Sequence, residues 1–274
     1  MKVALKMVPV ILALVLGAIV LPSTSYSACQ DIAFVYSDAT DAGSYKALLD
    51  ANGYPTTLIP MNGVATTDFS SYGTIIIGHG TGNLNTWGDS NSVAQIDNSG
   101  KPLIGLGEGG YAFFGKLLIE LGWPNGMHGS QAGLNVVDTS SPIFNSPNNI
   151  SIPASNDISI YSTSSPLVGI YFLPVPAGIT VFGRFSSQST HYMLSQQESR
   201  YLAWGFDDSP VSMTQTGRDL FINVVAYMAG CNDVDDVGQV PTLSEWGTII
   251  LGMLFTALLI LIGRQSDFMG KRII

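Results

Sequence analysis

Two long apolar stretches, one near each end of the chain, constrain what these 274 residues can fold into. The first covers residues 7–21, follows two lysines and gives way to small polar residues. A basic start, an apolar run and small residues in this order are typical of a secretory signal peptide, here over residues 1–27. We predict cleavage after Ser27, with cleavage after Ala28 as the alternative. The competing interpretation is a retained N-terminal anchor.

The second apolar stretch, residues 247–263, contains no charged residue and reaches the lower limit of length for a membrane-spanning helix. Basic residues follow it at Arg264, Lys271 and Arg272, whereas acidic residues precede it. Because positive charge marks the cytoplasmic side of a span, this asymmetry predicts a cytoplasmic tail and an external domain. We therefore expect one folded domain over residues 28–231, tethered to the inner membrane and lying in the periplasm.

The charge of the chain restricts its partners. A formal net charge of −9 and the lack of a basic patch argue against nucleic acid and anionic membrane surfaces, which would repel it. Residues 233–238 resemble a calcium-binding loop only faintly, because Val237 stands at a ligand position. We interpret residues 232–239 as a solvated acidic linker. The histidines His128 and His191 lie in polar segments without spaced ligand partners, so no metal and no cofactor is expected.

The two cysteines of the chain are Cys29 and Cys231. In an exported protein such a pair predicts a disulfide. Cys29 precedes the first expected strand and Cys231 follows the last expected helix, so an α/β fold would place both at the same edge of its sheet. Lipidation of Cys29 is the alternative, although the residues before it match a lipoprotein processing box poorly.

Short apolar runs alternate with potential helices between the two ends, a pattern that predicts an α/β domain with a doubly wound, mostly parallel sheet. The expected strands are residues 32–36, 56–59, 74–77, 102–106, 178–182 and 201–205. The expected helices are residues 44–51, 111–121 and 216–229, and residues 93–98 are expected to end another helix. Residues 125–165, rich in Ser, Asn and Pro, are interpreted as an insertion with a short strand at 134–137.

A box of eight residues precedes the second apolar stretch: Val240, Pro241, Thr242, Leu243, Ser244, Glu245, Trp246 and Gly247. With the apolar helix and basic tail of residues 240–274, it resembles the IPTL-type C-terminal sorting signal that exosortases recognise in Gram-negative bacteria. Val240 stands where that family usually has Ile, and the tail after Arg264 is longer and less basic. The resemblance implies export through the Sec machinery, a temporary membrane tether, cleavage near Pro241–Thr242 and release to the cell surface or medium.

Three separated segments, residues 75–82, 101–109 and 204–223, together resemble the class I glutamine amidotransferase-like fold, which is flavodoxin-like. In that family the first segment carries a strand and the oxyanion loop, the second the nucleophile elbow G-x-C-x-G, and the third the catalytic His and Glu. The resemblance implies backbone contacts to a ligand from Gly78, Gly80 and Gly107.

The catalytic residues of that family do not carry over. Gly107 stands at the position of the nucleophilic Cys, Asp207 at that of the His, and Ser209 at that of the Glu. A glutaminase needs a thiolate and a base to activate it, so glutamine hydrolysis is not expected.

Two functions stay open for this domain. The first is a non-catalytic domain that binds a small molecule, a glycan or matrix material outside the cytoplasm. The second is a hydrolase with a cleft rebuilt around Glu108 and His79, with Asp207 as a further candidate, because a His and a carboxylate can act as a base and its orienting partner. The plain interpretation is that His79 is tolerated in a glycine loop and that Glu108 caps the following helix.

Overall fold

Five parallel strands form one half of the central sheet in the computed structural model, which describes residues 31–230 and residue 251. Their spatial order is β2-β1-β3-β6-β13. The strands are β1 (Ile32–Tyr36), β2 (Thr56–Pro60), β3 (Thr74–Ile77), β6 (Leu103–Leu106) and β13 (Tyr201–Trp204). This is the flavodoxin-like order, whose direction of winding reverses between β1 and β3. Each of these strands was expected from an apolar run, because strands covered on both faces are almost continuously hydrophobic.

Antiparallel strands extend the sheet beyond β13 in the order β12-β11-β8-β9, and β10 pairs with both β12 and β7. Their bounds are β7 (Gly126–Gln131), β8 (Gly133–Val136), β9 (Asp157–Ser159), β10 (Ser165–Tyr171), β11 (Ile179–Arg184) and β12 (His191–Gln197). The structure therefore confirms the expected α/β sheet. The sheet is mixed, because its parallel half continues into an antiparallel half. The segment interpreted as an insertion, residues 125–165, supplies strands β7 to β9 of this antiparallel half.

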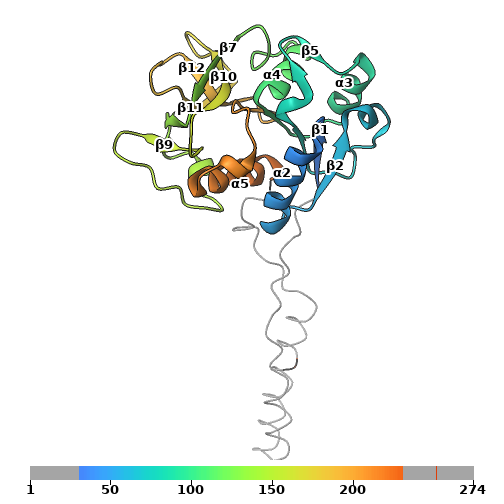
Figure 1. The fold of residues 1–274 in the computed structure, drawn as a ribbon, viewed down its shortest axis with the longest axis horizontal. Helices are drawn as coiled ribbons and strands as arrows, with labels where there is room; N and C mark the ends of the chain where they lie inside the picture. The colour runs from blue at the N-terminus through green and yellow to red at the C-terminus, as the bar shows by residue number, and fades with distance from the viewer. Residues whose placement is uncertain (1–30, 231–250, 252–274) are drawn as a thin grey trace, which may run out of the picture. The chain divides into compact units, whose positions relative to one another are not determined.

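Helices cover both faces of the parallel half (Figure 1). The helices α2 (Ala39–Ala51) and α5 (Gln215–Ala229) bury their apolar residues in one core cluster, and α3 (Ser90–Asp97) and α4 (Gly107–Lys116) bury theirs in another. Strand β3 separates the clusters, because Ile76 belongs to the first and its neighbours Ile75 and Ile77 to the second. This alternation is what the side-chain period of two residues requires in a strand.

The helix expected over residues 111–121 begins earlier and ends earlier in the structure. It starts at Gly107, directly after β6, and ends at Lys116, and Leu118 then adopts a φ of 58°. The first turn needs glycine because it touches neighbouring backbone: a Cβ on Gly109 would lie 2.1 Å from the Gly78 carbonyl oxygen, and one on Gly110 would lie 2.2 Å from the Gly105 carbonyl carbon. Helix α4 is thus pressed against the ends of β3 and β6.

The expectations for the chain ends concern residues outside the described ones. These are the signal peptide, both cysteines, the acidic linker, the sorting box and, apart from residue 251, the apolar stretch at 247–263. Within the part of the chain that is described, no helix has the length and apolarity to cross a membrane.

Candidate functional site

Three connecting segments and the first turn of helix α4 meet at the carboxyl edge of the parallel strands. Residues 37–38 follow β1, residues 78–81 follow β3, residues 107–108 follow β6, and residues 205–208 follow β13. Sheets of this type bind ligands beyond the carboxyl ends of their strands, where the winding direction reverses. This edge is therefore the candidate site, and it contains the sequence candidates His79, Glu108 and Asp207.

Asp207 fills the space beside Gly107. A Cβ built on Gly107 would lie 2.5 Å from Asp207 Oδ1 and 2.8 Å from both Asp207 Cα and Cβ, closer than real Cβ atoms approach. The backbone of Gly107 has a φ of 47°, a conformation that side chains other than glycine rarely adopt. The same carboxylate oxygen lies 3.4 Å from the backbone nitrogen of Glu108. The position that corresponds to a nucleophile in the resembling family thus has no side chain and no room for one.

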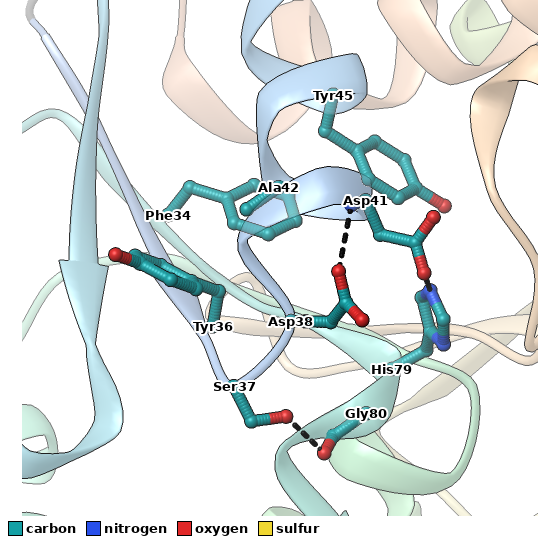
Figure 2. Close-up of a pocket in the computed structure, with 10 residues that line it drawn as sticks. Phe34, Tyr36, Ser37, Asp38, Asp41, Ala42, Tyr45, His79 and Gly80 are labelled. Carbon is teal, nitrogen blue, oxygen red and sulfur yellow. Dashed lines mark hydrogen bonds and ion pairs between the residues drawn. The ribbon is translucent and has the colours of Figure 1, made fainter.

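The imidazole of His79 lies between two carboxylates that come from different elements. Its Nδ1 is 3.3 Å from Asp207 Oδ1, and its Nε2 is 3.4 Å from Asp41 Oδ2 in helix α2. Figure 2 shows the Asp41 carboxylate and the His79 ring facing each other across the edge of the site. Burial by itself lowers the pKa of His79, but contact with Asp207 and the negative charges of Asp207, Asp41 and Asp208 outweigh it and raise the pKa. The arrangement therefore favours a protonated, positively charged His79.

Two buried tyrosines hold the loop that carries Asp207. The hydroxyl groups of Tyr45 and Tyr161 both donate to the backbone carbonyl of Asp208, at 2.8 and 3.1 Å. Burial raises the pKa of both phenols, so they stay protonated as donors at neutral pH. The 205–208 loop is consequently fixed from two sides.

The glycine loop after β3 is tied to the protein itself. The backbone nitrogen of Gly78 donates to the Val35 carbonyl at 2.9 Å, and the Gly78 carbonyl accepts from Thr81 Oγ1 at 2.7 Å. The Ser37 hydroxyl donates to the carbonyl of Gly80 (Figure 2). The backbone groups of Gly78 expected to contact a ligand therefore already have partners.

A small cavity lies at the reversal point of the sheet, between the ends of β1 and β3. Its lining includes Ser37, Asp38, Asp41, Tyr45 and His79, and its volume is about 10 Å³ (Figure 2). A cavity of that size holds about one water molecule. It has no room for an amino acid or a sugar.

Glu108 has a different partner from the one considered from sequence. Its Oε2 lies 2.5 Å from Nε2 of His128, and its Oε1 accepts from the backbone nitrogen of Leu84, in the turn between β4 (Gly82–Asn83) and β5 (Thr86–Trp87). The Glu108 side chain is only 12% exposed, whereas that of His128 is 52% exposed. Sequence reasoning missed this pair because His128 lies on β7, in the segment interpreted as an insertion.

Glu108 and His79 therefore lie at the same edge but in separate contacts, one with His128 and the other with Asp41 and Asp207. His191, the third histidine, packs against the rings of Tyr171 and Phe185 instead. Among residues 31–230, no group of three or more His, Cys, Asp or Glu side chains is arranged to hold a metal ion.

Comparison with known proteins identifies one motif in the chain. Residues 239–265 match the IPTL-CTERM motif, which is an exosortase sorting signal and implies that the chain is exported and sorted to the surface. No curated protein matches the sequence.

Several solved structures are similar at low identity. A GMP synthase subunit from Thermoplasma acidophilum is 14% identical, with a TM-score of 0.47 over 73% of this chain and 95% of that one. PurLQS from Thermotoga maritima is 13% identical, with a TM-score of 0.46 over 72% of this chain and 99% of that one. The glutaminase domain of Trypanosoma brucei CTPS is 13% identical, with a TM-score of 0.42 over 74% of this chain and 95% of that one.

Proposed function

We propose that this protein is a surface-sorted, non-catalytic member of the amidotransferase-like fold that has a binding or structural role outside the cytoplasm. The observation that carries the proposal is Asp207 packed against Gly107. Covalent glutamine hydrolysis needs a nucleophile at this point and space for the substrate carbonyl beside it. The chain has neither, because the side chain that occupies the space is a carboxylate already in contact with His79.

The charge and shape of the carboxyl edge limit what the domain can bind. The cavity of about 10 Å³ between the ends of β1 and β3 has room for nothing larger than a water molecule. A small molecule or an extracellular glycan would therefore bind outside this cavity. The net charge of −9 argues against nucleic acid as a partner.

A glutaminase assay tests the absence of catalysis. The full chain should release no ammonia from glutamine above the buffer rate, and a thiol-directed glutamine analogue should leave its mass unchanged. The Gly107→Cys variant should remain inactive, because the new side chain collides with Asp207. Glutamine hydrolysis by the natural chain that is lost in His79→Gln or Glu108→Gln would refute the proposal.

One contact favours the alternative function, a hydrolase. Glu108 binds Nε2 of His128, which leaves Nδ1 of a half-exposed ring in a position to accept a proton from water. This version of the alternative replaces His79 by His128 as the partner of Glu108. It predicts hydrolysis of activated esters by the full chain, and loss of that activity in both Glu108→Gln and His128→Gln while the unfolding midpoint is kept. A natural chain without esterase activity would eliminate it.

For the chain ends we propose a signal peptide cleaved after Ser27, an inner-membrane tether through residues 247–263 and processing by an exosortase near Pro241–Thr242 in a Gram-negative host. We further propose a disulfide between Cys29 and Cys231. Helix α5 runs back from the carboxyl edge and ends at Ala229, so parallel topology brings the chain near residue 230 to the amino edge, where β1 begins at Ile32. This topology supports the cysteine pair.

Intact mass and fractionation of the protein from its host test these proposals together. A mature chain that begins near Ala28, ends near Pro241 and gains about two mass units on reduction would support all of them. A chain that retains residues 247–274 in the inner membrane would refute processing, and an unchanged mass on reduction would refute the disulfide.

A further inference from the structure

We infer that the Asp207 carboxylate is a built-in ligand: it occupies a carboxylate-binding site formed by His79 and the start of helix α4, and thereby keeps the carboxyl edge closed. The inference rests on the proposed function, because it explains why the edge is occupied instead of open. It also states the chemistry of the site, which should accept a small monocarboxylate once the Asp207 side chain is removed.

Two groups that can bind an anion lie beside the Asp207 carboxylate. Oδ1 of Asp207 lies 3.3 Å from Nδ1 of His79 and 3.4 Å from the backbone nitrogen of Glu108. An imidazolium and a backbone N–H are both groups that bind an anion. They belong to segments that follow different strands, β3 and β6, and neither is part of the loop that carries Asp207.

The Asp207 side chain fills a space beside Gly107. Gly107 leaves a gap into which the atoms Cα, Cβ and Oδ1 of Asp207 pack directly. Removal of the side chain would leave a gap open on one side, because the Asp207 side chain is 30% exposed. A small anion can therefore enter from solvent and reach the positive ring.

A second carboxylate, that of Asp41, also lies beside the His79 ring. Asp41 Oδ2 lies 3.4 Å from the other ring nitrogen of His79, Nε2, and its negative charge also acts to raise the pKa of the imidazole. The other acidic groups whose charges act on His79 are Asp208 and Asp38. None of these three has the contact with Gly107 and Glu108 that defines the site.

Rescue by acetate in the full-length Asp207→Ala variant tests the inference. At pH 6 and constant ionic strength, replacing sodium chloride by sodium acetate should raise the thermal midpoint of this variant by roughly 2–4 °C, with saturation. The neutral analogue acetamide should have no such effect. Asp138→Ala is the matched control, because Asp138 accepts from the amide and hydroxyl of Ser140 without a cationic partner. Equal acetate shifts in both variants, or in the natural chain, would overturn the inference.

A second variant covers the case in which Asp207→Ala does not fold. Asp207→Asn keeps the shape of the side chain and removes its charge, so the His79 titration measured by NMR should move to lower pH than in the natural chain. An unchanged titration would overturn the inference. Failure of this inference can be distinguished from failure of the proposed function, because the proposed function is tested by glutamine hydrolysis in the natural chain, without either Asp207 variant.

Discussion

The Tyr45 hydroxyl in helix α2 donates a 2.8 Å hydrogen bond to the backbone carbonyl of Asp208, which lies 163 residues further along the chain. Tyr161 donates to the same carbonyl at 3.1 Å from the antiparallel side of the domain. One carbonyl therefore ties together a helix, a loop and the antiparallel half, and it fixes the residue next to Asp207.

We predict that Tyr45→Phe lowers the free energy of unfolding by about 1 kcal/mol, the usual net contribution of one hydrogen bond. Tyr161→Phe should cost a similar amount. The double variant should lose more than the two single losses combined, because the carbonyl then has neither tyrosine as a donor. Urea unfolding of the four proteins measures the coupling, and strict additivity would show that the tyrosines act independently.

We predict that Gly107→Ala destabilises the domain well beyond the cost of a positive φ, because the new Cβ meets Asp207. Gly100→Ala is the matched control: Gly100 has a φ of 67°, and a Cβ there meets nothing within 4 Å. The control should lose roughly 1–2 kcal/mol from backbone conformation alone. Combining Gly107→Ala with Asp207→Gly should recover the part of the loss due to collision. Equal losses for the two single variants would contradict the packing of Asp207 against Gly107.

We predict that His79 makes the domain more stable in mild acid than in mild base. The pKa of His79 is raised in the folded protein above its ordinary value of 6.5, so folding favours the protonated ring. This contribution is complete well below pH 6.5 and is lost as the pH rises through the higher, folded-state pKa. Relative to His79→Gln, the natural chain should therefore lose free energy of unfolding between pH 6 and pH 9. A difference that grows with pH would have the wrong sign.

We predict that Asn223→Ala costs roughly 2–3 kcal/mol, because it removes three hydrogen bonds to backbone groups that are buried at Ile143 and partly buried at Asn148. The Asn223 side chain accepts a hydrogen bond from the backbone nitrogen of Asn148 at 2.8 Å. It donates to the backbone carbonyls of Ile143 and Asn148 at 2.9 and 2.7 Å. The matched control, Asn52→Ala, removes an exposed side chain that donates to the Leu48 carbonyl, and it should change stability by no more than about 0.5 kcal/mol. Chemical denaturation measures the free energy of unfolding of both variants. Faster hydrogen exchange at the backbone amide of Asn148 should be seen only in Asn223→Ala.

The parallel half of the sheet could be predicted because burial on both faces produces continuous apolar runs, as in Thr74–Ile77. The antiparallel half of the sheet was harder to predict from the sequence. Strand β7 (Gly126–Gln131) has few apolar residues, and its pairing with β10 rather than its composition holds it in place. Helix α4 was expected to begin at residue 111, because a run of glycines normally argues against a helix, whereas here close backbone contact requires them.

The candidate site was predictable only to the level of the edge on which it lies. Strand order places His79, Glu108 and Asp207 at one edge. Their partners depend on side-chain positions that no local pattern encodes: Asp41 comes from a helix and His128 from a distant strand. The sequence shows that position 107 has no side chain, but it does not show that the Asp207 carboxylate fills the space beside it.

The glycines of helix α4 make the tolerance of this site to mutation asymmetric. At Gly109 and Gly110 the backbone of α4 touches that of Gly78 and Gly105 so closely that any side chain would displace the helix. An exposed rim side chain such as that of His128, which is 52% exposed, can be exchanged without moving the main chain. Substitutions around the rim can therefore change what the surface recognises, whereas any side chain at position 107 needs a simultaneous change at Asp207 and has to fit beside the fixed backbone of helix α4.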